Sequence, residues 1–261
     1  ALYVLYDKDS IADDDKRDRA YLSAMREINR QHPNDSDVAA LYAASYMSIA
    51  RWSYWAIDGT PLDETLAVAL ALEHIMKADM TNPGVLHLHI HLVESSLTPQ
   101  RALKSAEALE ATVPIAGHVV HMPSHIYIRV GRYLDAVKVN QTAILADEDY
   151  IAQCFSQGLY PLAYYPHNIH FLWSSASLLG SSEIAIDAAK KTAEKVPTGE
   201  LVTLPFLQDF SATPLLAYTR FGKWNEILTI PAPSSDIKHL NLIRHYARGI
   251  AFIRKGNLKD A

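Results

Sequence analysis

The stretch VGRYLDA (130–136) carries a pattern that returns three more times along the chain. In most copies a glycine is followed two residues later by a large residue and, three residues after that, by a small or apolar one. The other copies are LGSSEIA (179–185), FGKWNEI (221–227) and KGNLKDA (255–261). Four copies in order predict repeated helix pairs, because a glycine readily ends a helix and a small residue lets a second helix pack closely.

This pattern resembles the tetratricopeptide repeat (TPR), in which the glycine ends the first helix and the small residue packs the second helix against it. TPR sequences also place a proline twelve residues after the small residue. Pro114 and Pro197 follow Ala102 and Ala185 at this distance, whereas Glu148 takes that place after VGRYLDA. The resemblance implies a single superhelical TPR-like solenoid over the whole chain, 1–261, expected to be part of a longer chain. An irregular helical bundle is the alternative.

The composition favours helices throughout the chain. Glycine is scarce, at 10 of 261 residues, and leucine, alanine, isoleucine and tyrosine recur at helical spacing. The clearest periodic segments predict helices over 37–50, 64–78, 101–113 and 182–196. The expected fold class is therefore all-α.

Charge and hydropathy narrow the range of partners. The net charge is -5 with both signs interspersed, and no stripe of lysine and arginine stands out, which argues against a nucleic-acid partner. No apolar run approaches the ~18 residues that a membrane span needs. The single cysteine, Cys154, excludes a disulfide within this chain and a cysteine-based zinc site.

Histidines gather in the middle of the sequence. Of the 12, eight lie between positions 87 and 170, at the starts of three expected helices within 82–96, 118–131 and 166–180. At 100° per residue, His87, His91 and Glu94 share one helix face. His89 points to the other side and is expected to be structural.

The two later helices repeat this arrangement. His121 and His125 are four residues apart, with Pro123 between them suited to a first helical turn, and His167 and His170 are three apart. Because the first helices of stacked TPR-like pairs line one concave face, three helices would offer histidine pairs to one strip. Imidazoles with a carboxylate suit a transition metal, here Cu, Zn or Fe, as one ion or two.

The expected metal site has ligands and supporting residues. The ligands are His87, His91, Glu94, His118, His121, His125, His167 and His170, with His118 either a ligand or a support. Hydrogen bonds to the ligand rings are expected from Tyr127, Ser124 and Asn168. The alternative is that these histidines are polar groove residues that bond tyrosine, serine or backbone groups, or hold a peptide carboxylate.

Two longer stretches carry a closer resemblance. HMPSHIY (121–127) and YPHNIHFLW (165–173), with a His-x-x-x-His-x-x-Glu helix before them, are similar to a family of bacterial TPR proteins with no established reaction. The match covers about residues 20–200, and it places the eight predicted ligands at motif positions. His89 stands where that family usually has an aromatic residue. Because its members often carry an export signal, the resemblance implies a periplasmic or extracellular protein, with a cytoplasmic location left open.

Function is expected to lie in the concave groove. No nucleophile or cofactor loop is specified, so catalytic residues stay unassigned, and a binding or assembly module for a protein or peptide, with self-assembly as a further mode, is the first hypothesis. Aromatic anchors for a partner are expected at Trp52, Trp55, Tyr160, Tyr164 and Tyr165. A metal-dependent oxidoreductase or hydrolase with a mono- or dinuclear centre is the competing hypothesis. The tyrosine-rich segment 150–166 is either a packed loop or, as we favour, a lid.

Overall fold

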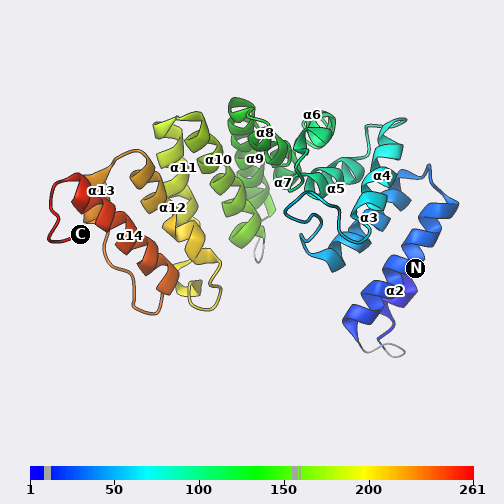
Figure 1. Cartoon of the computed structure of the whole chain (residues 1–261), viewed down its shortest axis with the longest axis horizontal. Coiled ribbons are helices and arrows are strands. Elements are labelled where there is room, and N and C mark those ends of the chain that lie inside the picture. Colours follow the sequence, from blue (N-terminus) through cyan, green and yellow to red (C-terminus); the bar gives the residue numbers. More distant parts are fainter. Residues whose placement is uncertain (9–12, 155–157, 159) are drawn as a thin grey trace. The chain divides into compact units, whose positions relative to one another are not determined.

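The computed structural model describes residues 1–8, 13–154, 158 and 160–261. Helices form the regular structure of these ranges (Figure 1), in which no β-strand occurs and one isolated bridge joins Trp55 to Pro61. The all-α class predicted from the sequence is confirmed. None of the helices in the described ranges combines the length and apolar character needed to cross a membrane.

The chain divides into two compact units, residues 1–114 with 125–131 (unit 1) and residues 115–124 with 132–261 (unit 2). Unit 1 contains α1 (Leu2–Tyr6), α2 (Asp14–Gln31), α3 (Ser36–Ala50), α4 (Thr65–Met76), α5 (Pro83–Val93), the 3-10 helix η1 (Pro99–Ala102), α6 (Leu103–Leu109) and most of α8 (Pro123–Arg129). Unit 2 contains α7 (Gly117–His121), α9 (Tyr133–Cys154), the π-helical turn η2 (Tyr160–Tyr164), α10 (Tyr165–Leu179), α11 (Ser182–Glu194), η3 (Thr198–Glu200), α12 (Leu207–Arg220), α13 (Trp224–Thr229) and α14 (Lys238–Arg254).

Helices of unit 1 pack on their neighbours in sequence and on the next but one. α3 contacts α2, α4 and α5, and α5 also contacts α4 and α6. Their shared core includes Tyr42, Tyr46, Leu72 and Val85. α3 and α4 confirm the helices predicted over 37–50 and 64–78, because their apolar residues recur at the spacing that this packing buries.

Unit 2 is built in the same way. α10 contacts α9 and α11, α12 contacts α11 and α14, and α13 contacts α14. Ile169 and Leu172 on α10 lie in one core with Val137 on α9 and Ala188 on α11. α11 confirms the helix predicted over 182–196.

The four glycines of the repeated pattern all adopt left-handed backbone angles. Their φ values are 81° at Gly131, 82° at Gly180, 70° at Gly222 and 78° at Gly256. Each follows the end of a helix, namely α8, α10, α12 and α14. Glycine reaches this region without steric cost, which explains why the pattern carries it at each helix end.

One predicted helix is shorter than expected. The periodic segment 101–113 forms the end of η1 and then α6, which stops at Leu109. Pro114 lies five residues further on, and a proline disfavours helical backbone in the residue before it, so the helix cannot reach the end of the periodic pattern. Beyond the helix, the Thr112 hydroxyl donates a hydrogen bond to the Leu109 carbonyl, with 2.7 Å between the two oxygens.

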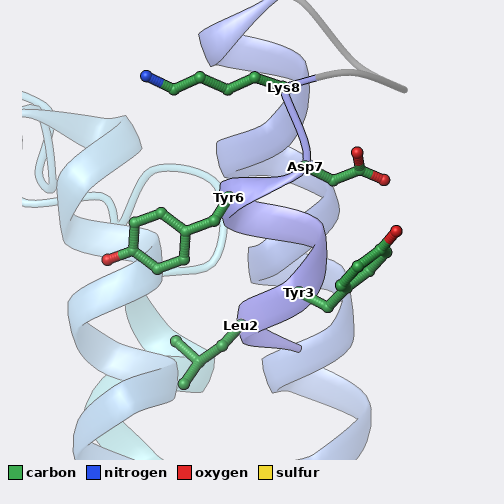
Figure 2. Close-up of a pocket in the computed structure, with 5 residues that line it drawn as sticks. All are labelled: Leu2, Tyr3, Tyr6, Asp7 and Lys8. Atoms are coloured by element: carbon green, nitrogen blue, oxygen red, sulfur yellow. The ribbon is translucent and has the colours of Figure 1, made fainter.

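The N-terminal helix α1 leaves an apolar surface open. The guanidinium of Arg17 on α2 donates to the Leu5 carbonyl at 3.2 Å, which ties α1 to α2. Leu2, Tyr3 and Tyr6 line a pocket, and Figure 2 shows Leu2 and Tyr6 on one side of helix α1 and Tyr3 on its other side. None of the predicted metal ligands lines this pocket.

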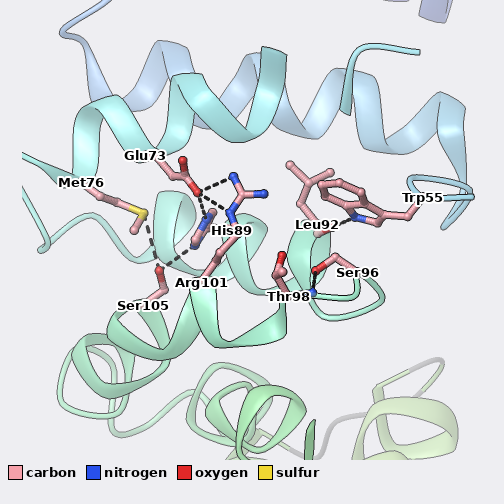
Figure 3. A network of polar contacts seen from close by, with 9 residues as sticks. All are labelled: Trp55, Glu73, Met76, His89, Leu92, Ser96, Thr98, Arg101 and Ser105. Carbon is pink, nitrogen blue, oxygen red and sulfur yellow. Dashed lines mark hydrogen bonds and ion pairs between the residues drawn. The ribbon is translucent and has the colours of Figure 1, made fainter. Parts of the chain in front are cut away.

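A polar network around the buried His89 connects α4, η1, α5 and α6 (Figure 3). His89 Nδ1 lies 2.8 Å from Ser105 Oγ, and His89 Nε2 lies 3.3 Å from the Glu73 carboxylate, which also accepts from Arg101 at 2.8 Å. A serine, a histidine and a carboxylate in this order resemble a hydrolase triad. His89 and Ser105 are both 0% exposed, however, so the arrangement is out of reach of a substrate and holds helices together. The structural role predicted for His89 follows from these contacts.

The first prediction concerns the left-handed glycines. Gly180→Ala is expected to lower the free energy of unfolding by about 1 kcal/mol, because an alanine Cβ is strained at positive φ while nothing else lies within 4 Å of it. Gly199→Ala is the matched control, since Gly199 is also exposed with open space around it but has no positive φ. Urea denaturation of both variants measures the difference, and equal stability would contradict this account of the pattern.

The second prediction concerns the buried network. His89→Ala is expected to cost about 3 kcal/mol of unfolding free energy, because it opens a cavity and removes the partner of Ser105 and one partner of Glu73. His74→Ala is the control, because His74 is an exposed histidine of α4 that bonds only the Asn34 side chain among the contacts described. A His89→Ala variant as stable as this control in thermal and urea melts would show that the network does not support the fold.

Candidate metal centre

Helix α5 carries the first group of predicted ligands. The side chain of Asn82 accepts a hydrogen bond from the Val85 amide and so fixes where the helix starts, with a proline in its first turn. The ring centres of His87 and His91 lie 4.9 Å apart, as expected for residues one turn apart. Glu94 caps the C-terminal end of the same helix.

Glu94 joins two histidines from separate helices of unit 1. Its Oε1 atom lies 2.8 Å from Nδ1 of His91, and its Oε2 atom lies 2.5 Å from Nδ1 of His125. The two rings meet at 74°, with centres 5.1 Å apart. Ligand-type atoms of these three residues lie within 4.8 Å of one another, so the group could hold a metal ion.

The electrostatics of this group follow from burial and hydrogen bonding together. Burial acts to raise the pKa of Glu94, but the hydrogen bonds to His125 and His91 outweigh it and lower that pKa to about 2. Burial lowers the pKa of His91, against the opposing effect of its bond to Glu94. At neutral pH the carboxylate is therefore ionised and the His91 ring is neutral, which is the form of imidazole that binds metals.

An exposed tryptophan stands beside these rings. Trp52 is 61% exposed, and its ring meets that of His91 edge to face with centres 4.9 Å apart. The backbone places it there through two successive left-handed residues, Arg51 with φ 44° and Trp52 with φ 72°. Such backbone costs about 1–3 kcal/mol per residue and tends to gather at functional sites. The indole therefore gives this group an aromatic face toward solvent.

The second group lies in unit 2 and centres on His121. Nδ1 of His121 lies 2.9 Å from Asn140 Oδ1 and 3.2 Å from the Ser124 hydroxyl. The Asn140 amide nitrogen donates to the Ala136 carbonyl at 2.7 Å, so its oxygen must be the atom that faces the ring. An oxygen acceptor requires a proton on Nδ1, and the lone pair of the neutral ring is then on Nε2.

That Nε2 atom faces a second imidazole. Nε2 of His121 and Nε2 of His167 lie 3.2 Å apart, and the ring centres are 4.8 Å apart. Two nitrogen ligands at about 2.0–2.1 Å from one tetrahedral ion are about 3.3 Å apart. The pair therefore has the separation that a shared ion requires.

The tyrosine-rich segment reaches the same group. Tyr160 and Tyr164 stack with ring centres 5.7 Å apart, and Tyr164 meets the ring of His118 at 5.0 Å. His118 in turn lies 5.7 Å from His121 between ring centres. Residues 155–157 and 159 of this segment are outside the described residues, so a lid over 150–166 stays a prediction.

A buried aspartate behind these residues was not among the predicted ones. Asp147 is 0% exposed and accepts hydrogen bonds from Tyr160 at 2.5 Å and from Asn168 at 2.7 Å. Burial raises the pKa of Asp147, against these two bonds. A Cβ at Gly117 would lie 1.8 Å from its Oδ1 atom, so α7 can approach this carboxylate only because position 117 has no side chain.

Both Asn140 and Asp147 could have been found from the helix pattern. They are seven residues apart on the face of α9 that also carries the buried Ala136, Ala143 and Ile144. A polar side chain on an apolar helix face needs a buried partner, so these two positions pointed to polar contacts in the interior.

His170 does not join its predicted partner. Its ring packs on Trp173 and Phe210, with centres 4.8 Å and 5.4 Å apart, whereas His167 packs on Phe171 and meets His121. Among the described residues, His170 belongs to none of the ligand-type groups. Burial lowers its pKa to about 4, with a smaller opposing effect from Asp209.

The predicted supporting residues and partner anchors make the following contacts. Ser124 contacts His121 as stated, while Asn168 bonds Asp147 and the Tyr127 hydroxyl donates to Glu110 at 2.9 Å. Among the expected partner anchors, the Trp55 indole donates to the Leu92 carbonyl at 2.7 Å. Tyr165 is a core residue of unit 2 whose hydroxyl donates to Glu148 at 2.7 Å.

A third prediction follows from the burial of His170. The unfolded chain protonates this ring near its ordinary pKa of 6.5 and the folded chain only near 4, so the unfolded state binds more protons between these values. Its contribution lowers stability as the pH falls from 6.5 to 4, by about 3 kcal/mol in total at about 1.4 kcal/mol per unit. Unfolding free energies measured across this range should show a shallower loss in His170→Phe than in the wild type. His245→Phe, which changes an exposed ring, should keep the wild-type slope; an unchanged slope in His170→Phe would contradict the prediction.

A scan of the chain against protein-family models finds no match, and a search of curated proteins finds none either.

Proposed function

We propose that this protein is a TPR-like binding module that holds one or more transition-metal ions, Zn, Cu or Fe, through its clustered histidines. One observation carries the proposal. The Nε2 atoms of His121 and His167 face each other at 3.2 Å, while Asn140 holds the opposite nitrogen of His121. Borderline and soft divalent ions favour neutral imidazole, and a supported ring is the usual form of a histidine ligand.

A direct hydrogen bond is the competing explanation of this pair. If His167 carries its proton on Nε2, it can donate to the Nε2 lone pair of His121 at the same distance. Both arrangements place a lone pair of His121 toward His167, so they differ only in whether an ion replaces the proton. A metal-binding measurement separates them.

The order of contacts supports the TPR-like part of the proposal. Within unit 2 each helix from α9 to α12 packs on the next, and α12 also packs on α10 and α14. Left-handed glycines stand after α8, α10, α12 and α14, at the places where a TPR ends its first helix. Stacked helix pairs of this kind bury a continuous core and leave a surface for partners.

A protein or peptide is the proposed partner. Trp52 is largely exposed beside His91, and Tyr164 is 40% exposed beside His118, so each histidine group carries an aromatic side chain that solvent can reach. Tryptophan and tyrosine are enriched among the residues that carry most of the binding energy in protein interfaces. The resemblance of HMPSHIY and YPHNIHFLW to exported bacterial TPR proteins further supports a periplasmic or extracellular module.

A fourth prediction tests the metal site. Protein purified without chelator should contain zinc, copper or iron by elemental analysis, and metal-free protein should take up zinc in a calorimetric titration. His167→Ala should weaken this uptake by more than the roughly 10–100-fold that loss of a supporting residue costs, because it removes a ligand. The double variant His121→Ala/His167→Ala should remove it from the unit 2 group.

The matched control changes two exposed histidines instead. His32→Ala/His245→Ala removes the same number of imidazoles from the surface and should bind zinc as the wild type does. Circular dichroism of every variant checks that the helices remain. Full zinc uptake by folded His121→Ala/His167→Ala, or no uptake of Zn, Cu or Fe by the wild type, would leave the hydrogen-bonded explanation of the pair.

A further inference from the structure

The carboxylate of Glu94 makes contacts that are too short for a metal ligand shared with its neighbours. Its two oxygens lie 2.8 Å and 2.5 Å from the Nδ1 atoms of His91 and His125. An oxygen and a nitrogen that bind one tetrahedral ion at about 2.0–2.2 Å each are about 3.3 Å apart. Distances this short are those of charge-assisted hydrogen bonds.

The direction of these two hydrogen bonds is fixed by chemistry. An ionised carboxylate has no proton to give, so it accepts and each imidazole donates. The two short contacts of Glu94, at 2.8 Å and 2.5 Å, are both to ring nitrogens that can donate, which is the environment of an ionised carboxylate. Both rings must therefore carry their proton on Nδ1, and in the neutral ring the lone pair is on Nε2.

We propose that Glu94 is a positioning residue, and not a ligand, that fixes His91 and His125 together in the tautomer with the proton on Nδ1 and the lone pair on Nε2. This inference rests on the proposed metal-binding function and assigns a role within it. Histidine ligands commonly donate their second ring nitrogen to a carboxylate, which orients the ring and raises its basicity. Here one carboxylate serves two rings from two helices, α5 and α8.

Helix α5 also carries His89, a histidine expected in the opposite tautomer, which serves as a reference. Nε2 of His89 faces the Glu73 carboxylate, and its Nδ1 faces the Ser105 hydroxyl. A carboxylate on Nε2 requires the proton there, so His89 is expected as the Nε2-protonated tautomer. One nitrogen-detected NMR spectrum of the metal-free protein should therefore contain both tautomers, assigned by single histidine substitutions.

The decisive variant is Glu94→Gln. A glutamine has almost the same shape, but it offers one accepting oxygen and one donating nitrogen where glutamate offers two acceptors. It can hold one of the two rings in the wild-type tautomer and must drive the other to accept at Nδ1. Glu110→Gln is the matched control, because Glu110 accepts from the Tyr127 hydroxyl and not from a histidine in the contacts described.

Long-range proton–nitrogen spectra of the metal-free proteins at about pH 8, above the ordinary imidazole pKa of about 6.5, read the tautomers directly. We expect His91 and His125 both protonated on Nδ1 in the wild type and in Glu110→Gln, and one of them protonated on Nε2 in Glu94→Gln. A wild-type ring protonated on Nε2, or unchanged tautomers in Glu94→Gln, would overturn the proposal.

A zinc titration of the same samples separates this proposal from the wider one. If Glu94 only positions the rings, their Nδ1 protons should persist when zinc is bound, and Glu94→Gln should weaken zinc binding at this group by about 10–100-fold. Loss of the Nδ1 proton signals on zinc addition would show that the ion binds on the carboxylate side and would overturn the positioning role. Expected tautomers without any zinc uptake would refute metal binding while supporting the role of Glu94 in fixing the rings.

Discussion

Each of the two nitrogens of an imidazole buried between helices needs a suitable neighbour, and this constraint governs the histidine group of each unit. One nitrogen carries a proton and needs an acceptor, and the other carries a lone pair. In unit 1 Glu94 accepts from two rings, and in unit 2 Asn140 accepts from His121. Leaving such a group without a partner would cost about 1–3 kcal/mol, so these acceptors are conditions for burying the rings at all. Because both act on Nδ1, Nε2 is the atom that faces the remaining neighbours.

The helices were predictable because their evidence is local. The periodic segments that became α3, α4 and α11 carry an apolar face that the neighbouring helices bury, and the four glycines of the repeated pattern stand after helices with left-handed backbone. The segment 101–113 shows the limit of periodicity, since its apolar pattern continues beyond Leu109, where α6 ends, and Pro114 disfavours helical backbone only at residue 113. The TPR-like arrangement itself stays a prediction, because it depends on how successive pairs stack.

The site was predictable in part, because only some of its contacts are local in sequence. The spacing of His87 and His91 fixes their neighbourhood through one helical turn, and the face of His89 separates it from them. What Asn140 and Asp147 contact, and that His170 packs on Phe210 of α12, depends on side chains from other helices. Spacing along one helix says which residues share a face, but the partner opposite that face comes from tertiary packing.

Gly117 allows the close contact between α7 and α9 in unit 2. With no side chain of its own, it lets the backbone of α7 lie directly on the Asp147 carboxylate of α9, where even a methyl group would overlap an oxygen atom. His118 and His121 follow on the same short helix, so a shift of the backbone at residue 117 would also move the backbone that carries both rings. The positions of the two imidazoles thus depend on a residue without a side chain. Any substitution that adds a side chain at position 117 would displace the histidines of this group without changing a histidine.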